Sequence, residues 1–314
     1  MKILICPLNW GLGHATRCVP LIRQLLVDGH EPVVVSDGFP LEFLKQQFPS
    51  LRYIEYPSYP VVYAAGKSQI GAMLFNMPAI LKGILNEHLW LRELLRSEHF
   101  DQVISDNRFG MWNKNARTVY ITHQLMVKMP RKLKFLEPLV HALHLKCIKQ
   151  YDECWIPDIQ EKGGLSGDLS HKYPLPPNAS FIGPLSRFKG LQDTLPDTGY
   201  DVVAVVSGPE PQRTLFEKDV LNRLKEKGKQ VLIVAGQPQS VQKESRIGNV
   251  RVVSHLNDKE LAAVLLGTKK IISRSGYSTI MDLDALGCLH KTAFIPTPGQ
   301  TEQEYLKVLH NRII

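Results

Sequence analysis

The chain has 314 residues, of which 44% are hydrophobic and 22% are charged. These fractions are those of ordinary globular proteins, so the sequence predicts a substantial core and excludes extensive disorder. The formal net charge of +8 favours an anionic partner such as a nucleotide, a phosphorylated sugar or a lipid head group. The sequence lacks Lys/Arg runs and a basic stripe with interleaved aromatic residues, which argues against nucleic acid.

Cysteine usage and hydropathy indicate where in the cell the protein is expected. The five cysteines are odd in number and no pair has metal-ligand spacing, so neither a disulfide framework nor a zinc site is expected. The apolar residues 1–7 are too few for a signal peptide, and no apolar run approaches the about 20 residues of a membrane-spanning helix. We therefore expect a cytoplasmic protein that would reach a membrane-bound substrate from the inner face of the cell membrane.

In chain order, the first half alternates short apolar runs with helical patterns. Residues 2–6 form the first expected strand, a glycine loop follows, and residues 15–27 form a helix. Alternating strands and helices predict a parallel sheet that is covered on both faces. Further strands are expected at 32–35, 51–55, 102–105, 119–122 and 153–156, with the longest helix from about residue 80 to residue 98.

Residues 157–198 are rich in Gly, Pro, Ser and Asp, and they separate this half from a second α/β series. We therefore predict an α/β protein of two Rossmann-like domains, residues 1–190 and 191–314, with a ligand site in the cleft at the carboxyl ends of the strands. The expected strands of the second series are 202–206, 230–234, 250–253, 270–272 and 292–295, and its expected helices lie near 211–225, 258–266, 278–286 and from 302 onward.

The loop after the first strand contains glycines that let the backbone approach a ligand, and the next helix presents free N–H groups to negative charge. A dinucleotide fingerprint would need a third glycine where Thr16 stands, so a nicotinamide enzyme is disfavoured even though Asp37 follows the second strand. Gly13 and His14 lie where the loop turns into the helix. An imidazole there is well placed as a general base, while a histidine bonded to nearby backbone is the alternative.

Two strand–helix connections of the second series have the same character. Ser207, Gly208 and Arg213 predict an anion site at a helix start, the alternative being an ordinary connection with a solvated arginine. Ser275 and Gly276 lie in the second connection, where small and hydroxyl residues again stand between a strand and a helix.

The helix after this connection carries a candidate ribose ligand. Asp282 would lie about one turn into it, where a carboxylate can accept hydrogen bonds from two adjacent ribose hydroxyls. Together with Asp284 it superficially resembles the acidic metal motif of other transferases. Residues two apart on a helix point in different directions, so no metal site is expected.

The last connection leads into a helix rich in Gln and Glu. Gln300, Gln303 and Glu304 have the paired donor and acceptor groups that read sugar hydroxyls. A polar helix start whose acidic residues favour the helix dipole is the alternative.

Two first-domain segments also follow strands and so belong to the predicted cleft. Asp106, Asn107 and Arg108 form one segment, and His123 and Gln124 belong to the other. Either segment is a candidate to hold the acceptor or to supply a base, and satisfied loop polar residues are the alternative for each.

The order of these segments resembles that of family 28 glycosyltransferases of the GT-B fold. The best-known activity of that family adds N-acetylglucosamine to a lipid-linked peptidoglycan precursor. The resemblance covers nearly the whole chain and is strongest over residues 272–282 and 298–305. It implies that the second domain binds a nucleotide sugar, a UDP-sugar in that family, and it implies no further cofactor.

The resemblance also implies roles for single residues. Asp282 matches the ribose-binding carboxylate, and His255 and Leu256 match the segment that packs beside the base. Gln303 and Glu304 match paired glutamines that face the donor sugar. Glu304 departs from the usual Gln, which leaves the identity of the sugar open.

Other positions depart from the family pattern. Ser207 and Gly208 replace a more glycine-rich diphosphate loop, and residues 11–18 look equally like the loop of nucleotide-sugar hydrolases with the same fold. The chain ends at Ile314, whereas GT-B proteins usually continue with helices that pack on the first domain, so a truncated or unusually short chain is expected.

These observations predict a metal-independent, inverting glycosyltransferase of the hexosyltransferase class. His14 would take the proton of an acceptor hydroxyl while the nucleotide diphosphate leaves, its charge stabilised by helix N-termini and arginine. Closure of the domains would exclude water. A nucleotide-sugar hydrolase or epimerase on the same fold and a non-catalytic carbohydrate-, nucleotide- or lipid-binding protein stay open as alternatives.

One apolar segment points to the acceptor. Residues 59–77 have no clear period, and Lys67 and Lys82 lie nearby. Such a loop could cover a lipid-linked acceptor or dip into an anionic membrane surface, while a lid over a soluble sugar is the alternative. Peripheral membrane binding of this kind predicts salt-sensitive attachment to anionic liposomes, reduced when Phe75 and Met77 are replaced by Ser.

Overall fold

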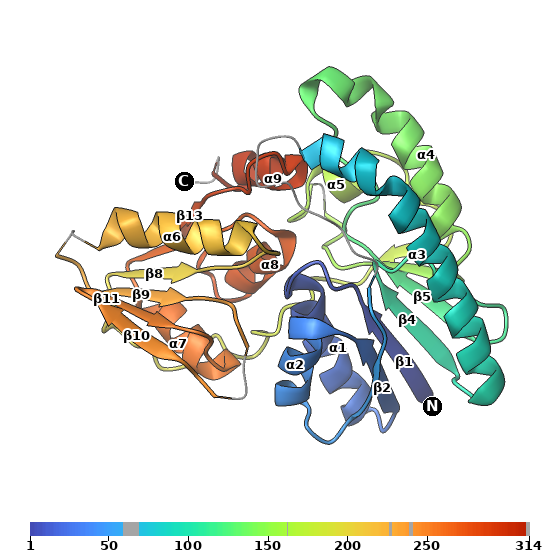
Figure 1. Cartoon of the computed structure of the whole chain (residues 1–314), viewed down its shortest axis with the longest axis horizontal. Helices are drawn as coiled ribbons and strands as arrows, with labels where there is room; N and C mark the ends of the chain where they lie inside the picture. Colours follow the sequence, from blue (N-terminus) through green and yellow to red (C-terminus); the bar gives the residue numbers. More distant parts are fainter. Residues whose placement is uncertain (59–68, 162, 226–227, 239–240, 312–314) are drawn as a thin grey trace.

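Two α/β units lie side by side in the protein (Figure 1). The computed structural model describes residues 1–58, 69–161, 163–225, 228–238 and 241–311, with the backbone alone for residues 69–76. Each unit has one sheet with helices packed on it, which confirms the predicted α/β class with two Rossmann-like units.

The first unit contains a seven-stranded parallel sheet in the order β3-β2-β1-β4-β5-β6-β7. Its central strands are almost wholly buried, as expected for a parallel sheet covered on both faces. The strands are β1 (Lys2–Pro7), β2 (Glu31–Ser36), β3 (Arg52–Glu55), β4 (Gln102–Asp106), β5 (Arg117–Ile121), β6 (Glu153–Ile156) and β7 (Ala179–Phe181). The helices are α1 (Gly13–Val27), α2 (Gly38–Gln47), α3 (Gln69–Ser97), the 3₁₀ helix η1 (Arg131–Leu136), α4 (Glu137–Ile148) and α5 (Asp168–His171).

The second unit contains a six-stranded sheet in the order β10-β11-β9-β8-β12-β13, in which only β10 is antiparallel to its neighbour. The strands are β8 (Val202–Val205), β9 (Val231–Val234), β10 (Glu244–Ile247), β11 (Val250–Val253), β12 (Lys270–Ser273) and β13 (Thr292–Phe294). The helices are α6 (Gln212–Leu224), α7 (Asp258–Gly267), α8 (Tyr277–Ala285), the 3₁₀ helix η2 (Leu289–Lys291) and α9 (Thr301–Asn311).

Three elements differ from the sequence-based expectation. β7 lies inside the stretch expected to be a connection, and β10 is exposed along its whole length, so neither has the apolar pattern of a strand. α3 begins at Gln69 rather than near residue 80, so residues 69–77 are helical although they show no clear period. Residues 59–68 of the predicted apolar loop lie outside the described residues.

The topology locates the ligand site. Strand order reverses between β1 and β4 in the first sheet and between β8 and β12 in the second. Ligands of open α/β sheets bind beyond the carboxyl ends of the strands at such switch points. His14 in the first turn of α1, Asp106 at the end of β4, Ser207 after β8 and Gly276 after β12 lie at these four places.

The chain between the two sheets is already anchored to the second unit before residue 190. β7 ends at Phe181 and β8 begins at Val202. Between them, Phe188 is 1% exposed and belongs to the core of the second unit, together with Leu169. The domain limits at residues 190 and 191 stay a prediction.

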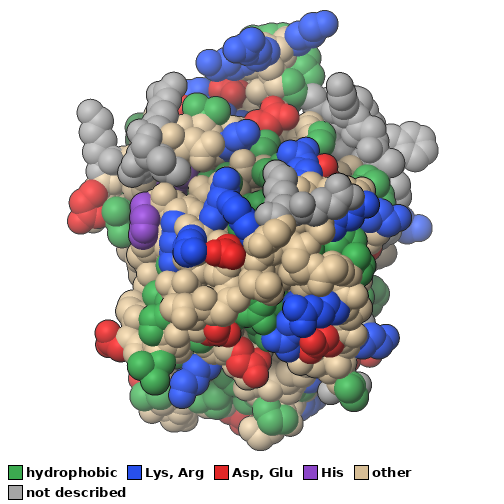
Figure 2. Space-filling model, turned by 90° about the vertical axis from the view of Figure 1, so that its left-hand side faces the viewer, with side chains coloured by type: hydrophobic (Ala, Val, Ile, Leu, Met, Phe, Trp, Pro, Cys, Tyr) green, Lys and Arg blue, Asp and Glu red, His purple; other side chains and the backbone are tan. Residues whose placement is uncertain are grey.

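On the face shown in Figure 2, Lys and Arg side chains lie among Asp and Glu side chains. The excess of positive charge is therefore spread over this face. Within the described part of the chain, no helix combines the length and apolar character needed to cross a membrane.

Candidate functional site

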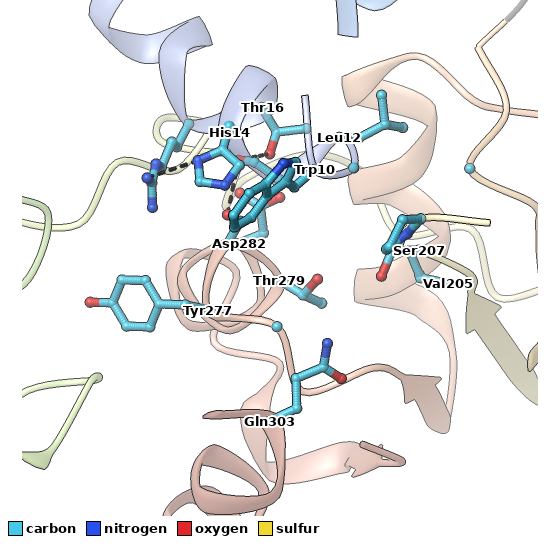
Figure 3. Close-up of a pocket in the computed structure, with 18 of the residues that line it drawn as sticks. Trp10, Leu12, His14, Thr16, Val205, Ser207, Tyr277, Thr279, Asp282 and Gln303 are labelled. Carbon is cyan, nitrogen blue, oxygen red and sulfur yellow. Dashed lines mark hydrogen bonds between the residues drawn. The ribbon is translucent and has the colours of Figure 1, made fainter. Parts of the chain in front are cut away.

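A cleft of about 920 Å³ lies between the two units at the switch points of both sheets. Figure 3 shows Trp10 of the loop after β1 and His14 of the first turn of α1, together with Thr279 and Asp282 of α8. The predicted residues that line the cleft are Gly13, His14, Asn107, His123, Gln124, Ser207, Gly208, His255, Leu256, Gly276, Asp282, Gln300 and Gln303.

The two units meet closely at glycines. Gly11 and Gly208 both have positive φ angles, 102° and 112°, and a β-carbon on Gly11 would lie 3.6 Å from the backbone of Gly208. A β-carbon on Gly13 would come within 2.9 Å of Ser278 Oγ, which donates a hydrogen bond to the Gly13 carbonyl. The backbone conformation therefore favours glycine at positions 11 and 208, and a side chain at position 13 would press against Ser278.

His14 and Asp106 form a hydrogen-bonded pair at the cleft. His14 is in the first turn of α1, Asp106 ends β4, and Nδ1 of His14 donates to Oδ1 of Asp106 at 2.8 Å. Asp106 is fully buried, whereas the His14 side chain is 15% exposed and lines the cleft. Because a carboxylate can only accept, the proton belongs on Nδ1 and the lone pair on Nε2, which suits Nε2 to take a proton from a ligand.

The electrostatic surroundings keep this pair in the state that a base needs. Burial lowers the pKa of His14 from its usual 6.5, and this effect exceeds the opposing influence of the Asp106 carboxylate. Burial alone would raise the pKa of Asp106, but the neighbouring Arg17 and His14 lower it to about 2. Asp106 is therefore an anion at neutral pH, and His14 is uncharged.

A chain of polar contacts runs from this pair to the second unit. Arg17 donates to both oxygens of Asp106, and its Nη1 lies 3.1 Å from His123 Nδ1. Nε2 of His123 donates to Glu302 of α9 at 2.9 Å, and the imidazole stacks on Tyr277 with 4.2 Å between ring centroids. Residues of both units therefore determine the environment of His14.

The start of α9 presents its polar side chains in different directions. Gln303 lines the cleft, and its Oε1 accepts from Thr297 N at 2.9 Å. Glu302 also lines the cleft, where it contacts His123. Glu304 is exposed and accepts from Gly299 N, so the structure places Glu302 rather than the predicted Glu304 beside Gln303 in the cleft.

Asp282 lies in the cleft as predicted, but its oxygens already have partners. Ser186 Oγ donates to Oδ1 at 2.7 Å, and Arg187 Nε donates to Oδ2 at 3.3 Å. Burial raises the pKa of Asp282, while Arg187 and Ser186 oppose the shift. Each carboxylate oxygen has two lone pairs, so Asp282 can still accept from a ligand.

The structure does not bring five of the predicted residues to the cleft wall. Asp106 is fully buried, and only its partner His14 lines the cleft. Arg108 is fully buried and pairs with Glu87. Arg213 is 6% exposed, since its guanidinium pairs with acidic residues of its own helix and the preceding loop and donates to a backbone carbonyl. Ser275 is fully buried and donates to the Gln303 carbonyl. Glu304, whose side chain is exposed, is the fifth.

The described residues contain no group of three or more His, Cys, Asp or Glu side chains that could hold a metal ion. Asp282 is 8% exposed whereas Asp284 is an exposed residue, so the two carboxylates face different surroundings.

The first-unit end of the cleft is apolar. Met77 and Ile80 of α3 line one side of it, and Leu136 and Val140 of η1 and α4 line the other. Phe109 packs against Ile80 and against His144 of α4, so the two helices flank one apolar compartment. This part of the cleft suits an apolar group rather than a second charged ligand.

Several residues of the site have no distinctive sequence signal. Trp10 lies in the glycine loop after β1, and Arg17 lies in α1. In this part of the sequence only His14 has a chemical role that the sequence itself suggests. Ser186 and Arg187 lie in the connecting segment, where no periodicity predicts their contacts. A full list of polar residues in the loops and first helical turns after strands would have found Arg17 but not the Ser186–Arg187 contact.

Comparison with known proteins confirms the GT-B fold. No family model matches the chain. Its sequence is 24% identical over a 318-residue alignment to an uncharacterized glycosyltransferase of Methanosarcina acetivorans, covering 97% of this chain and 82% of the relative. A second uncharacterized glycosyltransferase, from Methanosarcina mazei, is 23% identical over 319 aligned residues with the same coverage.

Solved glycosyltransferase structures share the fold of the whole chain. The calicheamicin glycosyltransferase CalG4 has a TM-score of 0.61 and 12% identity, covering 98% of this chain and 83% of that one. Arabidopsis thaliana UGT89C1, solved with UDP-L-rhamnose, has a TM-score of 0.57 and 12% identity, covering 98% of this chain and 82% of that one. Two α/β units facing each other across a cleft are thus common to all three structures.

Proposed function

We propose that the chain is a glycosyltransferase that moves a sugar from a nucleotide-diphosphate donor to an acceptor hydroxyl. The observation that carries this proposal is the His14–Asp106 pair, whose His14 lines the cleft together with loops and helix starts of the second unit. A buried carboxylate that orients an imidazole is a general arrangement for activating a hydroxyl group.

The donor would bind to the second unit. The N-terminal turn of α8 follows Gly276 and has no side-chain cap, so its backbone N–H groups are available for a diphosphate. Asp282, one and a half turns along α8, would take the ribose hydroxyls, and His255 and Leu256 line the part of the cleft suited to the base. Gln303 would read the sugar. A UDP-sugar is the first donor to test, because the resemblance to family 28 implies it.

The reaction we propose is a displacement with inversion at the anomeric carbon. Nε2 of His14 accepts the acceptor proton as the acceptor oxygen attacks, and the bond to the nucleotide diphosphate breaks on the opposite side. The N-terminal turn of α8 stabilises the departing charge, so this mechanism needs no metal ion. Asn107, His123 and Gln124 line the acceptor side.

We further propose that the acceptor is lipid-linked and is met at an anionic membrane. Two helices that flank the apolar end of the cleft also expose leucines or phenylalanine at four-residue spacing on their outer surfaces. We name these residues the apolar stripes: Leu81, Leu85 and Leu89 of α3, which are 60%, 56% and 41% exposed, and Phe135, Leu139 and Leu143 of η1 and α4, which are 75%, 58% and 52% exposed.

Charge next to the apolar stripes supports a membrane rather than a soluble partner. Arg131, Lys132 and Lys134 of η1 are exposed immediately before Phe135. Cations beside large exposed apolar side chains match an anionic bilayer, which attracts the charges and accepts the apolar groups. This surface takes the place of the predicted membrane loop as the main support for a lipid acceptor, since residues 59–68 lie outside the described part.

A thermal-shift screen against nucleotide diphosphates and their sugars tests the donor. A ligand present at 100 times its Kd stabilises the folded state by about 2.7 kcal/mol, so the donor nucleotide should raise the Tm clearly. Asp282→Ala should lose this shift and Asp284→Ala, its exposed neighbour, should keep it. No shift with any nucleotide or nucleotide sugar would contradict the proposal.

The same donor then separates transfer from hydrolysis. Incubation of protein and donor alone should release nucleotide diphosphate slowly, and an added lipid-linked acceptor should accelerate the release and yield a glycosylated product. Rapid release of free sugar without acceptor would instead identify a nucleotide-sugar hydrolase.

A further inference from the structure

Arg17 shares the carboxylate that orients His14. Its guanidinium is 2% exposed and donates to both Asp106 oxygens, through Nε and Nη2. His14 Nδ1 uses Oδ1 of the same carboxylate at 2.8 Å. One anion therefore serves two groups that can be cationic, and it cannot fully neutralise both at once.

The guanidinium also lies against two imidazoles. Nη2 is 3.0 Å from His14 Nδ1, and Nη1 is 3.1 Å from His123 Nδ1. A guanidinium has no acceptor, so it can donate to a ring nitrogen only where that nitrogen has a lone pair. His123 fits, because its Nε2 donates to Glu302 and its Nδ1 is free to accept from Arg17.

His14 is held in the opposite tautomer. Its Nδ1 faces Oδ1 of Asp106, and because a carboxylate oxygen can only accept, the proton belongs on Nδ1. Nη2 of Arg17 donates to the same oxygen. The charged and titratable groups around His14 are Asp106 from β4, Arg17 from α1, His123 from the loop after β5, and Glu302 from α9. Arg17 is the permanent cation among these four.

We propose that Arg17 is a positioning residue that fixes the Nδ1–H tautomer of His14 and keeps its imidazole uncharged, so that Nε2 remains free to accept a proton. Arg17 acts in two ways. It fixes the position of the Asp106 carboxylate through two hydrogen bonds, and its positive charge opposes a second positive charge on His14 at 3.0 Å.

This role explains why a buried arginine, Arg17, lies beside Asp106, the carboxylate that orients His14. With Asp106 alone, the imidazolium would be stabilised by a dedicated anion, and more of the base would be protonated near neutral pH. With Arg17 present, Asp106 still orients the ring, but its charge is largely balanced. The inference rests on the proposed function only for its kinetic consequence, since the titration of His14 can be measured without substrate.

The test is an NMR titration of ¹³C/¹⁵N-labelled histidine in the full chain, with the His14 signals assigned by their loss in His14→Gln. In the wild type, His14 should titrate below 6.5 and its ¹⁵N shifts should report the Nδ1–H tautomer. In Arg17→Gln its pKa should rise by about one unit or more, while Arg17→Lys, which keeps the charge, should show a clearly smaller rise.

Arg213→Gln is the matched control, because it also removes a buried guanidinium but lies in the second unit and outside the cleft wall. It should leave the titration of His14 unchanged. A folded Arg17→Gln with unaltered His14 titration would overturn the proposal. So would a wild-type His14 that titrates above 6.5 or carries its proton on Nε2, even if Arg17→Gln does not fold.

Once the donor is known, the acid limb of kcat/KM should move with the pKa of His14 in Arg17→Gln. A residue that only supports the fold would lower activity at all pH values without moving this limb. Absence of sugar transfer together with the expected titration would refute the proposed function and leave this inference standing. Sugar transfer by the wild type, together with a His14 titration that is the same in Arg17→Gln as in the wild type, would support the proposed function and refute this inference.

Discussion

Replacing His14 with Ala tests the base directly and leaves the surrounding structure with its main contacts. Asp106 keeps both hydrogen bonds from Arg17, so no buried carboxylate is left without a partner. The lost interactions are one hydrogen bond and the packing of a side chain that is 15% exposed. We expect the free energy of unfolding to fall by about 1–2 kcal/mol, which a folded domain of this size should tolerate.

The effect on catalysis should be larger. Loss of a general base typically lowers turnover by about 10²–10⁴-fold, which corresponds to about 3–5 kcal/mol of barrier height. The donor contacts we propose lie on the second unit, so the Kd of the nucleotide sugar should stay nearly unchanged.

Single-turnover kinetics at saturating donor, with calorimetry for the Kd, would measure both quantities. His99→Ala is the control, because the His99 side chain is 80% exposed and lies outside the cleft wall. Turnover of His14→Ala within about threefold of the wild type would refute the assignment of His14 as the base.

Three other predictions follow from the same site and surface. Asp282→Ala should weaken nucleotide-sugar binding by about 1–3 kcal/mol in calorimetry, the scale of lost hydrogen bonds to a charged group, and an unchanged Kd in the folded variant would remove Asp282 from the site. Because burial lowers the pKa of His14, the base stays unprotonated until the pH falls below 6.5, so the acid limb of kcat/KM should lie below that value; a limb above it would contradict the assignment. The wild type should sediment with anionic liposomes at low salt, Phe135→Ser/Leu139→Ser should sediment less, and Val241→Ser, which alters an exposed apolar residue of the second unit, should behave as the wild type; equal sedimentation of all three would exclude the apolar stripes as the contact.

The strands that the sequence predicts well have apolar runs of their own. Residues 153–156 and 250–253 coincide with β6 and β11, and none of their residues is exposed. β10 escapes prediction because all four of its residues are exposed and it exists by antiparallel pairing with β11. A strand of that kind is defined by its neighbour and not by its own hydrophobic pattern.

For the site, the strand topology predicts which segments reach the cleft, but not which of their side chains face it. Helices that follow strands at a switch point begin at the cleft, and on this rule the sequence places His14 and Asp282 there; both line the cleft. Which side chain of a helix start faces the cleft is decided by the residue at which the helix begins. α9 begins at Thr301, and neighbouring helical positions differ by about 100°, so Glu302 faces the cleft and Glu304 does not.

Contacts with other parts of the chain explain why Arg213 is not available for the predicted anion. Arg213 is in the first turn of α6, as expected for an anion site. Its guanidinium is engaged by Glu210 one turn before it and Glu217 one turn after it, and by the Ala235 carbonyl from another strand end. The two glutamates are visible in the sequence, but the carbonyl contact depends on how β8 and β9 pack.

The contacts of α9 connect the proposed donor site to the proposed base. Thr301 donates to the Lys128 carbonyl at 2.5 Å, and the Tyr305 hydroxyl accepts from Asp168 N at 2.7 Å, so α9 of the second unit is attached to the first. Glu302 lies between these contacts and holds His123, which accepts from Arg17. The helix that carries Gln303 therefore also completes the surroundings of the base. Separation of the units would break the Glu302–His123 contact and return water to His14. In the proposed mechanism, closure of the units around a donor would therefore also help to keep the base uncharged.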